Sequence, residues 1–227
     1  ENKHLKPEEK IKIRLAEFGI PVEPQETIVG NSVTQYQFKV SRGVRMSVFK
    51  KHRADIELAI KAKNDVRILA PIPGTDLVGI EVGNENRTIA RFADAPLHKN
   101  TLSLPLGMTV RGEPFTANLD EMPHLLIAGA TGSGKSILIH TIINALTKQM
   151  STDDLHLVLI DPKRVELMQF AKKRHLHGGK IAYEYKDAVL LLKGLTDEME
   201  ERYKVLEKAK VRDIAAYNTK NPESKMR

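Results

Sequence analysis

One octapeptide, Gly-Ala-Thr-Gly-Ser-Gly-Lys-Ser at residues 129–136, constrains what this chain can fold into more than any other feature of its sequence. It matches the P-loop pattern G-x-x-x-x-G-K-[ST] at every fixed position. Glycines in such a loop allow positive φ angles and close approach of the backbone, so that successive N–H groups can point inward at phosphate groups. The octapeptide therefore predicts a phosphate-binding loop between a strand and a helix.

The residues on both sides of the octapeptide have the patterns that a P-loop requires. Residues 124–128 are a short apolar run and predict a buried strand, and residues 137–146 predict an apolar helix. A second apolar run, residues 155–161, predicts another strand after this crossover. Strand, helix and strand in this order form the parallel α/β unit. The predicted fold class is therefore α/β, with a P-loop parallel sheet that is incomplete in this chain.

The P-loop assigns a role to each of its residues. Lys135 is the predicted catalytic residue, because it would bridge the β- and γ-phosphates of ATP, and the Ser136 hydroxyl would ligate Mg²⁺. ATP and Mg²⁺ are accordingly the expected cofactors. The predicted nucleotide-binding residues are Gly129, Ala130, Thr131, Gly132, Ser133, Gly134, Lys135 and Ser136.

Asp161, at the end of the second apolar run, has two interpretations. It could hold the Mg²⁺-bound water, or it could begin a turn of the Asp-Pro kind with Pro162. The turn is favoured, because no second acid follows Asp161. No later apolar run ending in Asp-Glu occurs before Arg227. We therefore expect the carboxylates for hydrolysis to lie outside this chain, which would be inactive alone.

The first part of the chain predicts a small α+β module that precedes the P-loop region. Its expected elements are helices over residues 8–19 and 53–64 and strands over residues 34–40, 66–70 and 77–82. The predicted domains are this module at 1–88, a connecting region with a hairpin near residues 110–114 at 89–120, and the N-terminal part of the ATPase domain at 121–227. A long amphipathic helix near the C-terminus carries an apolar stripe that is expected to pack on the sheet: Leu191, Leu195, Met199, Tyr203 and Leu206.

Composition and charge limit the class of protein. The chain has 227 residues, no cysteine and no apolar run long enough to span a bilayer, so this segment is expected to be cytoplasmic. Its net charge of +7 permits a polyanionic partner such as DNA. Two basic clusters could contact phosphates or could be ordinary solvated surface: Arg42, Arg45, Lys50, Lys51 and Arg53, and Lys172, Lys173 and Arg174.

Several motifs, in order along nearly the whole chain, resemble the FtsK/SpoIIIE family of bacterial DNA translocases. The P-loop and the residues before it, 122–136, are similar to that family's strand and P-loop, and Leu-Ile-Asp-Pro-Lys at 159–163 is similar to its next signature. The remaining matches are 166–167, 198–203, 211–218 and, in the first module, 15–20, 43–44, 72–74 and 112–114.

The resemblance implies a homo-hexameric ring that encircles double-stranded DNA and moves it with ATP turnover. Each subunit would have a small α module stacked on a RecA-like β motor domain. The family's acidic metal-site strand, arginine finger, DNA-tracking loops and winged-helix domain would lie beyond Arg227. Any membrane anchor would precede Glu1, so the parent protein would be attached to the bacterial inner membrane only through segments outside this chain.

Three hypotheses about function remain open at this point. The first is the ATP-driven DNA translocase, in which Lys163 and Glu166 could mediate subunit contacts or sensing, or could be structural. The second is a conjugative coupling protein or related ring ATPase, although those relatives continue the Asp-Pro-Lys signature with Gly, where this chain has Arg164. The third is a non-hydrolysing module that binds nucleotide and DNA and supports oligomerisation.

Overall fold

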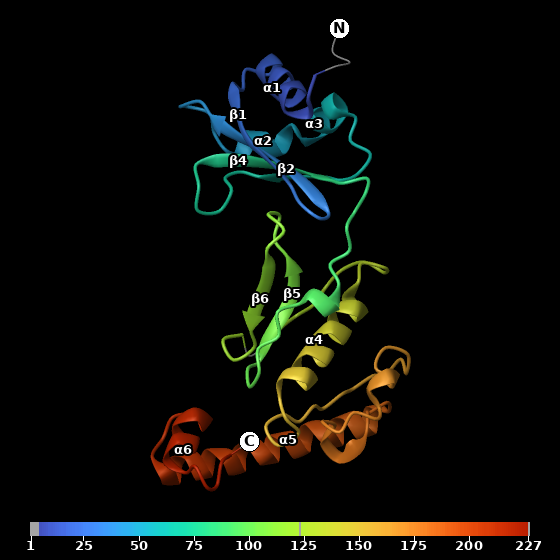
Figure 1. Ribbon diagram of the computed structural model, residues 1–227, viewed down its shortest axis with the longest axis vertical. Coiled ribbons are helices and arrows are strands. Elements are labelled where there is room, and N and C mark those ends of the chain that lie inside the picture. The colour runs from blue at the N-terminus through green and yellow to red at the C-terminus, as the bar shows by residue number, and fades with distance from the viewer. Residues whose placement is uncertain (1–4, 123, 227) are drawn as a thin grey trace. The chain divides into compact units, whose positions relative to one another are not determined.

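The computed structural model of the chain describes residues 5–122 and 124–226, which form two compact units (Figure 1). Unit 1 comprises the residues up to Ala95 together with Gly107–Phe115. Unit 2 comprises Pro96–Leu106 and the residues from Thr116 onward. The predicted boundaries at residues 88 and 120 stay a prediction, because these units divide the chain by contacts and not by function.

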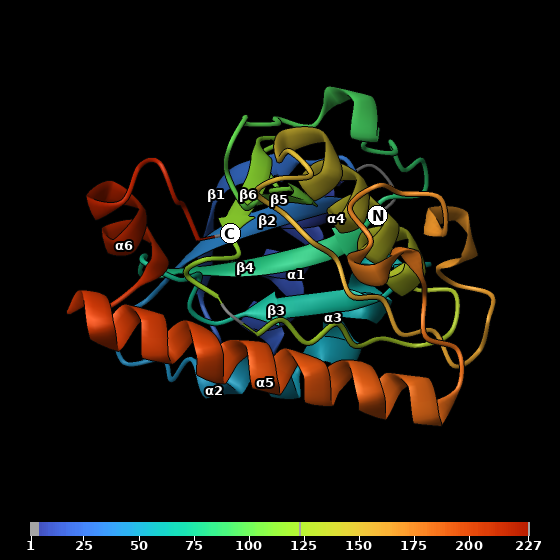
Figure 2. The ribbon, with the colours of Figure 1, turned by 90° about the horizontal axis from the view of Figure 1, so that it is seen from below.

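Unit 1 is a four-stranded antiparallel sheet with helices on one face. Its elements are α1 (Pro7–Glu17), β1 (Val22–Val29), β2 (Val33–Val40), α2 (Ser47–Lys51), α3 (Arg53–Ile60), β3 (Val66–Leu69), β4 (Leu77–Gly83) and a 3₁₀ turn, η2 (Phe92–Asp94). The strand order is β1-β2-β4-β3, and Figure 2 shows β4 between β2 and β3. The predicted helices and strands of this module are confirmed to within a few residues.

The two faces of this sheet differ because side chains alternate along each strand. Phe38 on β2 and Ile80 on β4 point to the helix-covered face, where they are fully buried with Leu15 of α1 and Ile56 of α3. On the opposite face, the side chains of Gln37, Gln35 and Glu81 form a buried chain of hydrogen bonds. The hydrophobic core of unit 1 therefore lies between the sheet and its helices.

Strand β1 and helix α2 were not predicted. Residues 22–29 are mostly polar and contain Pro24, but β1 is an edge strand, where a proline costs no ladder hydrogen bond. A bulge between Pro24 and Thr27 adjusts its register against β2. Near the end of β1, Arg111 donates two hydrogen bonds to the Glu26 carboxylate, and this bonding lowers the pKa of Glu26.

Unit 2 has a hairpin, three α-helices and a long irregular segment between two of the helices. Its elements are β5 (Ser103–Met108), β6 (Pro114–Asn118), α4 (Lys135–Gln149), the 3₁₀ turns η3 (Met168–Phe170) and η4 (His177–Gly179), α5 (Tyr185–Ala209) and α6 (Ile214–Lys220). The hairpin near residues 110–114 was predicted, although the tip, Gly107–Phe115, is grouped with unit 1. A core of six buried side chains joins α4 to the irregular segment: Ile143, Leu159, Leu167, Phe170, Leu176 and Ile181.

The predicted strand over residues 155–161 is present only as isolated pairing. Leu157 forms a parallel bridge with Leu176, and Ile160 forms one with Ala182. Both bridges have the parallel direction expected of a βαβ unit, but neither extends into a ladder. The mixed α/β fold class is confirmed, whereas a continuous parallel sheet is not formed by the described residues.

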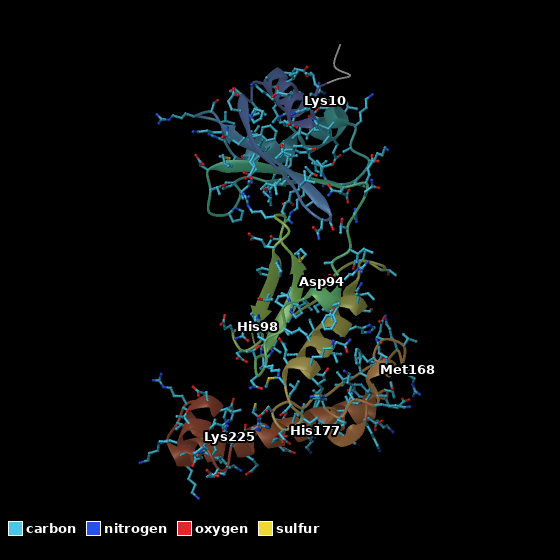
Figure 3. The ribbon with its side chains drawn as sticks, in the orientation of Figure 1. Lys10, Asp94, His98, Met168, His177 and Lys225 are labelled. Atoms are coloured by element: carbon cyan, nitrogen blue, oxygen red, sulfur yellow. The ribbon has the colours of Figure 1, made fainter. Side chains whose placement is uncertain are left out.

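The apolar stripe of helix α5 was predicted to pack on the sheet, and the structure differs from this prediction. None of its described residues is buried: Leu191 and Leu195 are half-buried, and Met199 and Tyr203 are 42% and 56% exposed. The expected packing of its stripe on a sheet is therefore wrong for this structure, because the sheet that would cover it is reduced to two bridges. His177 of η4 lies beside α5 (Figure 3) and lines a cavity of about 410 Å³ along it. No described helix has both the length and the hydropathy to cross a membrane.

Candidate nucleotide-binding site

The P-loop octapeptide folds into a tight turn, and glycine is favoured at three of its positions by positive φ angles or by a close contact. Gly132 and Gly134 have φ angles of 79° and 95°, which side chains other than glycine rarely adopt. A Cβ atom on Gly129 would lie 2.5 Å from Ser133 Oγ, so a larger residue here would require the Ser133 side chain to move. The Ser133 N–H donates to the Ala130 carbonyl at 3.2 Å and closes the turn.

The loop leads directly into α4, and the start of this helix carries unpaired N–H groups. Gly134 is the N-cap and has no side chain that could accept a hydrogen bond. The first hydrogen bond of the helix runs from the Leu138 N–H to the Gly134 carbonyl at 2.9 Å. Among the described residues, the backbone N–H groups of Lys135, Ser136 and Ile137 have no acceptor. Such donors, with the positive end of the helix dipole, suit an anion.

Lys135 extends over the loop that precedes it. Its ammonium donates to the carbonyl oxygens of Gly129 and Ala130, each at 2.8 Å. An ammonium has three N–H donors, so one remains for another acceptor. Ser136 lies beside Lys135 in the first turn of α4 and is half-buried. The two predicted phosphate and Mg²⁺ ligands are thus brought together at the uncapped end of the helix, and these residues fit a nucleotide phosphate chain.

Among the residues that the structure describes, the expected strand before the P-loop is absent. Residues 124–128 have no strand partner in this part of the chain, and Leu126 is 90% exposed. An apolar run of this kind is stable as a central strand only when neighbours pair with both of its edges. The described residues provide no such neighbour, since Leu157 and Ile160 pair with residues 176 and 182 instead. The prediction of a buried strand at 124–128 is therefore wrong for this structure.

Asp161 is used as a structural acceptor. It is 3% exposed, and its Oδ2 atom accepts the N–H groups of Glu166 at 3.0 Å and Leu167 at 2.9 Å. Its own N–H donates to the Ala182 carbonyl, and its carbonyl accepts the Arg164 N–H. This bonding supports the interpretation of Asp161 as the first residue of a turn. A role for Asp161 as a metal ligand stays a prediction.

Lys163 and Glu166 lie on that turn. The Lys163 side chain is exposed, and Glu166 is half-buried with its backbone bonded to Asp161 and to a histidine of α4. Between them, Arg164 has a positive φ of 57°, pairs with Glu184 and lies over the ring of Tyr183. Their predicted roles in subunit contact or sensing stay predictions.

His140 was not predicted, yet it connects the P-loop helix to the Asp161 turn. Its Nε2 atom donates to the Glu166 carbonyl at 2.6 Å, which makes Nδ1 the acceptor for the Gln169 amide at 2.8 Å. Its ring also meets Phe170 edge-on, with centroids 5.3 Å apart. The available sequence signal was a lone imidazole four residues after Ser136 in an otherwise apolar stretch of helix.

The two parts of the chain each match a described family. Residues 1–84 match the FtsK alpha domain, and residues 88–227 match the FtsK/SpoIIIE family. The chain belongs to the FtsK/SpoIIIE family.

Curated relatives of the chain are named DNA translocase FtsK. The protein of Streptococcus pyogenes is 42% identical over 212 residues, which are 91% of this chain and 26% of that protein. That of Streptococcus pneumoniae is 40% identical over 223 residues, 95% of this chain and 29% of that protein. That of Staphylococcus aureus is 40% identical over 208 residues, 90% of this chain and 26% of that protein. The chain thus spans between a quarter and a third of the length of these relatives.

A solved structure shares the fold. The conjugation coupling protein TcpA of pCW3, in a monomer form with ATPγS, superposes with a TM-score of 0.52 at 18% identity. The match covers 98% of this chain and 63% of TcpA. At this identity the likeness concerns the fold alone.

Proposed function

We propose that this chain is the nucleotide-binding part of an ATP-driven motor that moves double-stranded DNA. The observation that carries the proposal is the uncapped start of α4, where Lys135 and Ser136 meet three unpaired backbone N–H groups. The membership in the FtsK/SpoIIIE family and the names of the curated relatives support DNA as the molecule that the motor moves. The net charge of +7 is consistent with that polyanionic partner.

The P-loop residues would hold the phosphate chain of ATP. Lys135 would exchange carbonyl oxygens of its own loop for phosphate oxygens, and the N–H groups of residues 135–137 would donate to the same anion. Ser136 would supply a hydroxyl oxygen to Mg²⁺, a ligand type that this ion prefers. Bound Mg²⁺ would neutralise phosphate charge during phosphoryl transfer. TcpA was solved with ATPγS, which supports a nucleotide of this kind.

The assembly and hydrolysis belong to the same proposal. We infer a homo-hexameric ring around the duplex and attachment of the longer protein to a membrane from the family likeness alone. We expect the 227-residue chain by itself to bind nucleotide weakly and to hydrolyse little or none of it, because no apolar run that ends in Asp-Glu follows Asp161 within these residues.

The related alternative is a conjugative coupling protein. The fold likeness to TcpA favours it, but that likeness is at 18% identity, against 42% for the DNA translocase relative from Streptococcus pyogenes. Arg164, at the position where coupling proteins usually have glycine, also favours the translocase. A non-hydrolysing oligomerisation module is the remaining alternative, and an activity measurement separates it from both motors.

DNA-stimulated ATPase activity of the full-length parent protein tests the proposal. We expect phosphate release to rise at least ~tenfold on addition of linear duplex DNA, because a motor couples hydrolysis to its track. The Lys135→Ala variant is expected to lose this activity, and the 227-residue chain is expected to show little of it. A phosphate release rate that does not respond to DNA would contradict the translocase, and no phosphate release with or without DNA would favour the non-hydrolysing module.

A further inference from the structure

A stretch of unit 1 without acidic residues contains four closely spaced cations. No aspartate or glutamate occurs from Thr27 to Ala54. Within this stretch, four exposed side chains lie on the turn before α2 and on α2 itself, and we call them the basic tract: Arg42, Arg45, Lys50 and Lys51. Four positive charges within ten residues create a local positive potential on the surface of unit 1.

None of the four cations of the basic tract has a carboxylate partner, and the same holds for six other described cations of unit 1 that lie outside the tract: Lys6, Lys10, Lys39, Lys61, Arg87 and Arg91. Within the described residues, none of the four side chains has a carboxylate oxygen within 4.0 Å. Arg53, which follows the tract, pairs with Glu57 and Asp65. The other paired cations of the unit are Lys12, Arg14, Lys63, Arg67 and Arg111. The second basic cluster is less available, because Lys173 donates to Thr147.

The helix dipole explains only part of this arrangement. Lys50 and Lys51 occupy the last turn of α2, where a positive charge is favoured by a few tenths of a kcal/mol. Arg42 and Arg45 precede the helix, where that field is unfavourable for a cation. The tract therefore concentrates charge without an evident gain in the stability of the folded chain.

The backbone that carries the basic tract is held in place by the core. Gly43 has a φ of 91° in the turn, and the Val44 N–H donates to the Ser41 carbonyl. Phe49 of α2 is fully buried, and the apolar residues between the cations pack against the same core: Val44, Met46 and Val48. The buried apolar side chains thus hold the backbone of the basic tract in place while the charged side chains remain exposed. A backbone that is already ordered reduces the entropy cost of binding.

The same packing indicates the chemistry of the partner. Single-stranded nucleic acid binds by stacking its bases on exposed aromatic rings, but Phe49 is buried and the His52 ring stacks on Phe18. Membrane-bound helices insert apolar side chains, and those of the tract are turned into the core. Charges without stacking or apolar groups suit the phosphate backbone of a duplex.

We propose that the basic tract binds the phosphates of double-stranded DNA, so that unit 1 contributes its own contact with the track. The proposal rests on the proposed function for the identity of the polyanion. It assigns to the module before the P-loop a part in DNA binding that does not depend on nucleotide.

Salt-dependent DNA binding by the nucleotide-free 227-residue chain tests this contact. Fluorescence anisotropy with a labelled duplex would be measured over a series of salt concentrations for the wild type and for Arg42→Gln/Arg45→Gln/Lys50→Gln/Lys51→Gln. Each phosphate contact contributes about 0.9 to the slope of log K against log salt. We expect the quadruple variant to reduce this slope by about 2 to 4 and to weaken binding at low salt at least ~tenfold.

A second quadruple variant separates the position of the charges from the net charge. It removes four exposed cations of unit 2 by the change to Gln: Lys186, Lys193, Lys208 and Arg212. We expect its slope to remain within about 1 of the wild-type value. An equal loss in both variants, or no loss in the basic-tract variant, would overturn the proposal. If the quadruple variant fails to fold by circular dichroism, Arg42→Gln/Arg45→Gln and Lys50→Gln/Lys51→Gln are each expected to give about half of the effect.

Two further outcomes would also overturn the proposal. Sedimentation with phosphatidylcholine vesicles that contain phosphatidylserine would identify a membrane surface if the basic-tract variant lost vesicle binding and kept DNA binding. The basic-tract variant of the full-length protein would also be tested for DNA-stimulated ATPase activity and for DNA affinity. If its ATPase activity still responds to DNA and its DNA affinity is unchanged, the proposed translocase function stands and the basic tract is rejected as a DNA contact.

Discussion

Replacing Lys135 with alanine is expected to weaken the binding of ATPγS with Mg²⁺ to the 227-residue chain roughly 30- to 150-fold. The ammonium of Lys135 already lies over the loop, where it donates to the carbonyls of Gly129 and Ala130 and has a donor left. Charge-assisted hydrogen bonds to a phosphate contribute about 2–3 kcal/mol, which corresponds to that range of affinity. Isothermal titration calorimetry measures the dissociation constants directly.

Lys193→Ala is the matched control for this change. Lys193 is an exposed lysine of α5, so its removal alters the net charge by the same amount without touching the P-loop. The control is expected to keep the wild-type affinity within about twofold. Equal affinities of Lys135→Ala and wild type would show that the octapeptide does not hold the phosphates.

Replacing Asp161 with alanine is expected to destabilise the turn after residue 160 by roughly 2–4 kcal/mol. The carboxylate is buried and accepts two backbone N–H groups, those of Glu166 and Leu167, which alanine would leave without an acceptor. An unsatisfied buried donor costs about 1–3 kcal/mol. Hydrogen exchange of these two amides should accelerate roughly 30- to 1000-fold, which mass spectrometry of the peptide that contains them can measure.

The same variant distinguishes a structural aspartate from a metal ligand. Asp197→Ala, in the exposed middle of α5, serves as the control for loss of a carboxylate. If Asp161 is structural, Asp161→Asn should retain the Mg²⁺ dependence of nucleotide binding, because the asparagine oxygen has two lone pairs and can still accept the two N–H groups that now share Oδ2. Loss of the Mg²⁺ dependence with unchanged amide exchange would instead assign Asp161 to the metal.

Local patterns were sufficient to predict most of unit 1. Helix α1 follows from apolar residues at helical spacing that include Ile11 and Leu15, with Pro7 at its start and Gly19 at its end. Strand β2 follows from its alternation, since Phe38 points to the core and Lys39 to solvent. Strand β1 could not be predicted from the same rule, because an edge strand tolerates Pro24 and polar residues that a central strand excludes.

In unit 2, local sequence patterns were not sufficient to predict which segments form strands. Residues 124–128 and 155–161 have the apolar character of central strands, but a strand forms only when neighbours satisfy its backbone groups. Among the described residues, these runs have such neighbours only at the two isolated bridges centred on Leu157 and Ile160. The exposed stripe of α5 has the same cause, because no sheet formed by the described residues covers Met199 and Tyr203.

Some features of the candidate site could likewise be predicted from the sequence, and others could not. The P-loop residues could be assigned from sequence, because phosphate binding requires glycines, a lysine and a hydroxyl at fixed spacing. The hydrogen bond from His140 to Glu166 could not be predicted from sequence. It joins residues 26 apart in the chain, and its acceptor is a backbone carbonyl, which any residue type provides. The turn at Asp161 was one of two interpretations, and the structure supports it through the N–H groups of Glu166 and Leu167, which donate to the Asp161 carboxylate.

Displacement of a third strand from linear duplex DNA by the full-length parent protein tests the central claim most directly, because only movement along the duplex removes a stably bound triplex strand. We expect displacement with ATP, none with ATPγS, and none by the Lys135→Ala variant. ATP hydrolysis that is stimulated by DNA but leaves the third strand in place would contradict the claim that this chain belongs to a translocating motor.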